Sequence, residues 1–365
     1  MTEKQNRFEK HSTKITAVLY SVIGLLLLVG TFFLVKAARD ELNRGGERYI
    51  VLREPRPFQD ISHRPSTETL FLTTGLENKK YRLRVDADGY IIPSKVHENA
   101  DLSIVFLGGS TTECQYMDEL ARFPYLVGRH LENSLGITVN SFNTGHAGNN
   151  SEHSLFILQA KVVPKHPKIV VMMECVNDLT WLLTMGNYYA PHYNRGIIVE
   201  KEYNPIKNFI LSFVRQKAAV QFDANDEFAG YRESKKYISI EDICAQYKKN
   251  LELFVFICKQ QNIIPVLMTQ FNRFTMETKK EFQDNNHLKS LEDRFGMSFE
   301  QYYHSYHSLN NVQRIVAAEQ HIPLIDLDKL VPKSSEYMYD TVHLSEKGSR
   351  LVAEIIAKQL EPIAR

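Results

Sequence analysis

Apolar residues run from residue 15 to residue 35 without a charged side chain among them. At about 1.5 Å per residue, a helix of this length spans the ~30 Å hydrocarbon core of a bilayer. A cleaved signal peptide usually has a shorter apolar region of roughly 7–15 residues, although Val35-Lys36-Ala37 resembles a cleavage site. The pattern therefore predicts a retained transmembrane anchor over 15–35. A removed signal peptide and a buried core helix are the alternatives.

Basic residues flank this span equally on both sides, so their count does not set its orientation. They are Lys4, Arg7, Lys10 and Lys14 before the span, and Lys36, Arg39, Arg44 and Arg48 after it. A short tail such as 1–14 usually stays in the cytoplasm. We therefore expect a single-pass membrane protein whose remaining residues form an extracytoplasmic catalytic domain.

Residues 36–100 are polar and rich in proline, which predicts a stalk with a small strand pair. Within this segment the apolar residues of 81–85 and 90–93 flank Asp88-Gly89, a pair that favours a tight hairpin turn. The domain that follows is expected to span 101–365.

From residue 101 onward, short apolar runs alternate with segments of helical length. The runs are 103–108, 137–143, 168–174, 263–270 and 322–327, and the amphipathic segments are 124–135, 151–163, 241–261, 299–320 and 346–360. Unbroken apolar runs are typical of buried parallel strands, and alternation with helices predicts an α/β fold with helices on both faces of the sheet. Ligands bind such sheets beyond the carboxyl ends of the strands.

The segment 179–238 lacks clear periodicity and is rich in Tyr, Asn, His and Arg, which predicts an insertion beside the strand ends. It is either a lid over the site or a surface excursion without a role. The 44 basic and 43 acidic residues nearly cancel, so nothing in the charge favours a nucleic-acid partner. The four cysteines show no zinc-type spacing, and no cluster of residues suggests a metal or an organic cofactor.

Residues that could take part in catalysis follow the predicted strands. Ser110 stands after Gly108-Gly109, where a helix is expected to begin and its hydroxyl would be exposed. Gly148 and Asn177 follow the next two runs and can offer hydrogen-bond donors to a reacting oxygen, although a turn glycine and a helix N-cap are equally ordinary readings of them. Asp340 and His343 lie one turn apart, so the carboxylate can orient the imidazole toward Ser110.

Taken together, GGSTTE at 108–113, NTGHAGNNS at 143–151, CVND at 175–178 and DTVHLSEKG at 340–348 resemble the motifs of the SGNH hydrolases, or GDSL-type esterases and lipases. The resemblance covers roughly residues 103–359. It implies a three-layer α/β/α sandwich of flavodoxin-like type with a five-stranded parallel sheet. Two positions depart from the family pattern: Gly109 replaces an acidic residue, and Cys175 replaces a glycine.

The resemblance also implies roles for individual residues. Ser110 would be the nucleophile, His343 its general base and Asp340 the carboxylate that orients the base. The N–H groups of Ser110 and Gly148, with the side chain of Asn177, would form the oxyanion hole. No cofactor would be needed, and the substrate would be an acyl ester.

The motifs do not separate a hydrolase from an O-acyltransferase that moves the acyl group onto a cell-surface polysaccharide. Because the chain is expected to be anchored in a membrane, we expect the ester, of acetyl type, to belong to a cell-surface glycan or a lipid. A catalytically silent glycan-binding module is a third interpretation. Weaker candidates for substrate contact are Arg273, Tyr189 and Arg195. The sequence names no protein partner.

Overall fold

The computed structural model describes most of the chain. The described residues are 3–42, 51–190, 192, 195–196, 198–199, 238–279 and 295–365. Most of the predicted insertion at 179–238 therefore lies outside the described residues.

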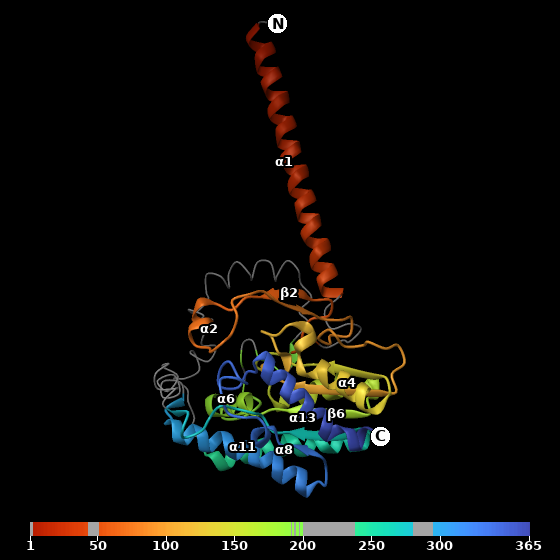
Figure 1. The fold of residues 1–365 in the computed structure, drawn as a ribbon. Coiled ribbons are helices and arrows are strands. Elements are labelled where there is room, and N and C mark those ends of the chain that lie inside the picture. The colour runs from red at the N-terminus through yellow and green to blue at the C-terminus, as the bar shows by residue number, and fades with distance from the viewer. Residues whose placement is uncertain are drawn as a thin grey trace.

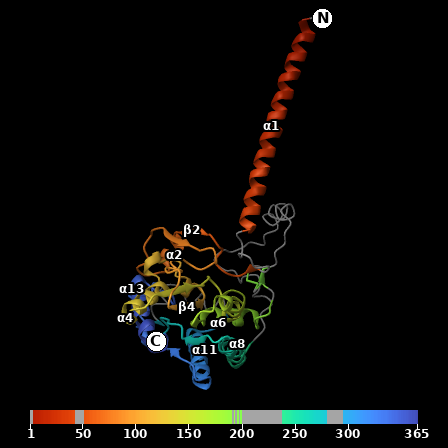
Figure 2. The same ribbon diagram turned by 90° about the vertical axis from the view of Figure 1, so that its right-hand side faces the viewer.

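The first element is a long apolar helix, α1 (Glu3–Leu42). Its stretch Lys14–Ala38 has a mean hydropathy of 2.6 and is not buried against any other part of the protein. Figures 1 and 2 show α1 projecting away from the α/β body. The helix is therefore long and apolar enough to cross a membrane, as the sequence predicts for 15–35.

Five parallel strands form the central sheet, in the order β5-β4-β6-β8-β9. Their bounds are β4 Leu102–Gly108, β5 Val139–Asn143, β6 Ile169–Met173, β8 Ile264–Met268 and β9 Leu324–Ile325. Ile104 of β4 pairs with Ser141 of β5 on one side and with Ile169 of β6 on the other. The strand that follows β4 in the chain, β5, is added on one side of it, and the next strand, β6, is added on the other side. Sheets of this kind bind ligands at the point where the strand order reverses in this way.

Helices cover both faces of this sheet, which confirms the three-layer α/β/α fold (Figure 1). One face carries α4 Phe123–Leu135 and α13 Glu346–Ala364, and the other carries α5 Ser151–Ile157, α6 Val176–Met185, α8 Ile240–Gln260 and α11 Phe299–Glu319. Successive strand residues point to opposite faces. Ile104 and Phe106 accordingly pack beneath α4 and α13, whereas Val105 and Leu107 pack beneath the other helices.

The remaining helical elements of the described residues are short. They are α2 Thr67–Phe71, α3 Ser110–Glu113, α12 Leu327–Leu330, the 3₁₀ turns Glu119–Ala121 and Val163–Lys165, and the π-turn Leu158–Val162. The predicted helix 151–163 is thus an α-helix only as far as Ile157. The π-turn and a 3₁₀ turn continue it to Lys165.

The N-terminal strands form two small antiparallel pairs. β1 (Val51–Leu52) pairs with β7 (Ile198–Val199), and β2 (Asp60–His63) pairs with β3 (Tyr81–Arg84). The predicted hairpin around Asp88-Gly89 is present as a short ladder. The N–H of Asp86 donates to the carbonyl oxygen of Tyr90 and that of Ile92 to the carbonyl oxygen of Arg84, both at 2.9 Å, on either side of the bridge between Val85 and Ile91. The sequence did not reveal the second neighbour of β3, which is β2.

Residues after position 51 belong to the folded body, so the expected stalk is wrong for them. Leu52 and Tyr90 are buried in the same core cluster as Val105 of the central sheet. The buried guanidinium of Arg122 donates to the carbonyl oxygens of Arg82 and Ile92, at 2.7 and 3.0 Å. Polar composition suggested a stalk, but the few apolar side chains of this segment find partners on the domain.

Candidate active site

Ser110, His343 and Asp340 form one chain of hydrogen bonds. Nε2 of His343 lies 2.8 Å from the Ser110 hydroxyl oxygen, and Nδ1 lies 2.7 Å from Oδ2 of Asp340. The other carboxylate oxygen of Asp340 accepts from the backbone N–H groups of Val342 and His343, which fixes the carboxylate in place. An imidazole held in this way can take a proton from the hydroxyl and later return it to a leaving group.

Ser110 owes its position to the turn between β4 and α3. A Cβ at Gly109 would lie 2.3 Å from Nδ2 of Asn177 and 2.9 Å from the backbone carbonyl oxygen of Asn149, so a side chain there would displace the Asn177 amide. Ser110 is the first residue of α3, where a backbone N–H has no acceptor within the helix. The glycine that departs from the family pattern therefore makes room for Asn177 next to the serine.

Asp340 and His343 shift each other's pKa. Burial alone would lower the pKa of His343, but the charge and hydrogen bond of Asp340 outweigh it and raise that pKa. Burial likewise opposes ionisation of Asp340, and the imidazole together with the two backbone N–H groups lowers its pKa below the usual range. At neutral pH the pair therefore holds an ionised carboxylate beside a base that is more basic than ordinary histidine.

Gly148 and Asn177 belong to two segments that lie against the Ser110 turn, because Gly109 is packed against the Asn177 amide and the backbone carbonyl of Asn149. Gly148 has φ +79°, which a side chain would strain, and it belongs to the loop between β5 and α5. Nδ2 of Asn177 donates to the carbonyl oxygen of Asn149 at 2.7 Å. An amide nitrogen carries two hydrogens, and this bond uses one of them.

Two arginines hold the Gly148 loop. Arg53 donates to the carbonyl oxygen of Ala147 at 2.8 Å and to Oδ1 of Asn149, and its own carbonyl accepts from Nδ2 of Asn149 at 3.1 Å. Burial lowers the pKa of Arg53 to about 10, against the opposing charges of nearby glutamates, so it remains a cation at neutral pH. Arg195 packs its guanidinium on Gly148 and donates to the Gly148 carbonyl at 3.2 Å.

Sequence patterns pointed to Arg195 but missed Arg53, because nothing in the local sequence links it to a loop almost a hundred residues away. Gln270 was missed as well. It accepts from the N–H of Val176 at 2.8 Å and donates to the Thr111 hydroxyl at 3.0 Å, so it ties the turn after β4 to the start of α6. The only signal for Gln270 is its place at the end of the fourth apolar run, 263–270.

The other singled-out residues lie elsewhere. Cys175 is fully buried, and its thiol points toward the carbonyl of Tyr306 in α11, so it does not narrow the approach to Ser110. Arg273 is only 6% exposed, and its backbone N–H donates to the carbonyl of Thr341, behind the loop that carries Asp340. Tyr189 is 79% exposed. Two hollows lie near Ser110, and neither Arg273 nor Tyr189 is among the described residues that line them.

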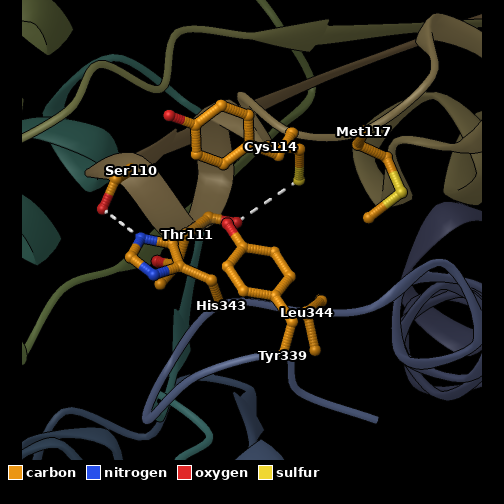
Figure 3. A pocket seen from close by; sticks show the side chains of 8 residues that line it. Ser110, Thr111, Cys114, Met117, Tyr339, His343 and Leu344 are labelled. Carbon is orange, nitrogen blue, oxygen red and sulfur yellow. Dashed lines mark hydrogen bonds between the residues drawn. The ribbon is translucent and has the colours of Figure 1, made fainter. Parts of the chain in front are cut away.

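A hollow opens beside the Ser110–His343 pair. Figure 3 shows the serine hydroxyl directed at the imidazole, with the ring of Tyr339 alongside. The two rings are nearly parallel, with an interplanar angle of 7° and centroids 5.7 Å apart. This inner hollow holds about 200 Å³ of open space, and its remaining walls are mostly apolar. They are Thr111, Cys114, Tyr116, Met117 and Leu344.

Comparison with known proteins gives one family match. Residues 106–351 match the GDSL-like lipase/acylhydrolase family. No curated protein matches the sequence.

Several solved structures are similar in fold at low identity. A lipase/acylhydrolase from Enterococcus faecalis is 18% identical, with 72% of this chain and 97% of that chain covered and a TM-score of 0.44. An acetylxylan esterase from Geobacillus stearothermophilus is 14% identical, covering 72% and 95%, with a TM-score of 0.41. An alpha/beta hydrolase from the metagenome of Lake Arreo, Spain, is 15% identical, covering 71% and 95%, with a TM-score of 0.42.

Proposed function

Since the chain belongs to the GDSL-like lipase/acylhydrolase family and is therefore an ester hydrolase, we propose that it removes short acyl groups, acetyl above all, through a covalent intermediate on Ser110. The observation that carries this proposal is the double hydrogen bond of His343, to Ser110 on one side and to Asp340 on the other.

In the first half-reaction the Ser110 oxygen attacks the ester carbonyl while His343 takes the hydroxyl proton. The carbonyl oxygen becomes an oxyanion, which we assign to the N–H groups of Ser110 and Gly148 and to the amide of Asn177. Collapse breaks the bond to the alcohol, and His343 delivers its proton to the departing oxygen. Water then attacks the acyl-enzyme by the same route and releases the acid.

The long apolar helix supports a location of the proposed reaction at a membrane. We infer that α1 anchors the protein with its α/β body outside the cytoplasm, so that the substrate is an acylated glycan or lipid of the cell surface. Anchoring raises the effective concentration of an enzyme next to a substrate in the same layer.

A fluorophosphonate probe tests the proposed nucleophile, because such a probe reacts only with an activated serine. We expect the full chain in detergent to be labelled at Ser110, and prior incubation with an acetyl ester to slow the labelling. Absence of labelling in the folded wild-type protein would contradict an activated Ser110.

Acetate release separates hydrolysis from transfer. The purified chain is incubated with an acetyl donor, with and without candidate sugar acceptors, and free acetate and acetylated sugar are both measured. We expect free acetate to account for the consumed donor in either condition. Acetylated acceptor formed at the expense of acetate would instead identify an O-acyltransferase that uses the same residues.

Asn177→Ala tests the proposed oxyanion donor. Loss of one such donor typically costs about 3 kcal/mol of transition-state stabilisation, so we expect kcat to fall by roughly 100-fold or more with little change in KM. Asn133→Ala, on the exposed face of α4, is the matched control and should keep wild-type kcat. A fall of less than threefold in Asn177→Ala would remove Asn177 from the oxyanion hole.

A further inference from the structure

We propose that the alcohol half of the ester is a sugar unit without a negative charge, and that it binds in a second, outer hollow that adjoins the inner hollow at Ser110 and His343. Part of this outer hollow is built by residues 75–81, which precede the region matched by the family. The inference rests on the proposed function, because it names the substrate class of the same site.

The outer hollow adjoins the inner one. Its space of about 430 Å³ includes open solvent. The two hollows have four lining residues in common, namely Tyr116, Met117, Tyr339 and Leu344. In our proposal a substrate whose ester lies at Ser110 extends along these shared residues into the outer hollow.

The route of the proton during catalysis assigns the outer hollow to the alcohol half of the ester. When the carbon–oxygen bond to the alcohol breaks, the proton that left Ser110 passes from Nε2 of His343 to the alcohol oxygen, so that oxygen must lie against the imidazole. His343 and the ring stacked on it, Tyr339, border the inner hollow, and Tyr339 continues into the outer one. Gly148 and Asn177, proposed for the oxyanion, are not among the described residues that line either hollow.

Aromatic rings line the path from the imidazole outward. Tyr339 stacks on His343, Tyr116 meets Tyr339 edge to face at 6.4 Å, and Tyr81 meets Tyr116 in the same way at 5.8 Å. A tyrosine combines an apolar ring with a polar hydroxyl, which suits a ligand that has C–H surfaces and hydroxyl groups together. A sugar ring has both.

Charged groups rim the far end of the outer hollow. They are Glu77, Asp118 and Glu346, with Lys79 between the first two at 3.0 and 2.9 Å and Ser345 beside the third. Carboxylates accept hydrogen bonds from sugar hydroxyls. Covering these charges with a fatty acyl chain would cost the free energy of desolvating them. Lys79 pairs with Glu77 and Asp118, and Arg350 pairs with Glu346 at 2.7 Å, so three carboxylates stand against two cations. This excess of negative charge disfavours an anionic sugar.

Tyr116 gives the first test, with the full chain in detergent and two acetyl esters. One ester is a monoacetylated methyl glucoside, and the other is vinyl acetate, whose leaving group is too small to reach the outer hollow. We expect Tyr116→Ala to lower the ratio of kcat/KM for the glucoside to kcat/KM for vinyl acetate at least tenfold. Tyr116→Phe, which keeps the ring, should stay within threefold of wild type. Tyr125→Ala, a half-buried tyrosine of α4 outside both hollows, is the matched control and should leave the ratio unchanged.

Three results would overturn the assignment. An unchanged ratio in Tyr116→Ala means that the sugar does not contact this wall. A change confined to the preference among vinyl acetate, butyrate and octanoate means that the hollow takes the acyl chain of a lipid. Wild-type protein without Ser110-dependent turnover of vinyl acetate removes the proposed function, and the sugar site with it, before any hollow variant is compared.

A charge variant keeps the proposal testable if Tyr116→Ala does not fold. Wild-type protein is expected to hydrolyse the acetylated methyl glucoside at least tenfold more efficiently than the corresponding glucuronide, and Glu77→Lys to reduce that preference at least threefold. Glu98→Lys is the matched control, because Glu98 pairs with Lys95 at the surface of the same N-terminal segment much as Glu77 pairs with Lys79. Equal effects of both substitutions, or none from Glu77→Lys, would contradict the sugar site.

Discussion

Ser110→Ala is expected to lower turnover of an acetyl ester by about a million-fold, because the variant has no oxygen with which to form the acyl-enzyme. The residual rate should still exceed that in water, since the proposed oxyanion donors and the bound substrate geometry remain. The measurement is kcat for vinyl acetate under saturating conditions, together with fluorophosphonate labelling, which should disappear.

The fold of this variant should survive. The hydroxyl of Ser110 makes its side-chain hydrogen bond to His343, and losing one such bond costs only about 1 kcal/mol. Thermal unfolding should therefore shift by a few degrees at most, and Ser134→Ala, an exposed serine of α4, should change neither activity nor stability. Wild-type turnover in a folded Ser110→Ala protein would mean that another group attacks the ester.

Local pattern predicts most of the α/β body because its core strands are buried on both faces. The five apolar runs all become strands of one sheet, and the bounds differ mainly where the runs extend beyond the ladder, as in 322–327, where only Leu324–Ile325 pairs. Helix ends follow local chemistry as well. Ser345 caps α13 by accepting from the N–H of Gly348, and this cap closes the segment that carries His343.

Contacts between distant segments are what local pattern does not reveal. Composition marks residues 36–100 as a stalk, yet Arg53 holds the loop of Gly148, and Tyr81 borders the outer hollow. The pairing of β3 with β2 was missed for the same reason. The turn signal at Asp88-Gly89 indicates only the partner that follows β3, whereas β2 lies about twenty residues before it.

The hydrogen-bond chain of Ser110, His343 and Asp340 combines one local contact with one between distant segments. Asp340 and His343 are three residues apart, so their hydrogen bond is a local consequence of the loop before α13. Ser110 lies 233 positions from His343, and only the parallel sheet brings the two together. The sequence could name these residues because ligands gather at the carboxyl ends of parallel strands, a property of the architecture that holds before any contact is known.

Asp340→Asn is expected to lower kcat by about 10,000-fold while leaving the fold intact. An asparagine keeps the shape of the side chain but carries no charge, and it can hold the imidazole in the wrong tautomer for accepting the Ser110 proton. The matched control is Asp101→Asn, a surface carboxylate that binds Thr138, for which kcat should be unchanged.

The pH profile distinguishes this role from a merely structural one. In the wild-type protein Asp340 raises the pKa of His343 above its ordinary value of about 6.5, and only the neutral imidazole can act as a base. The profile of kcat/KM should therefore fall as pH decreases, with a midpoint above 6.5. In Asp340→Asn the raising charge is gone and burial, which lowers the pKa, remains, so the midpoint should move to lower pH. A midpoint that does not move, or a loss of less than tenfold in kcat, would show that Asp340 does not orient or charge-stabilise His343.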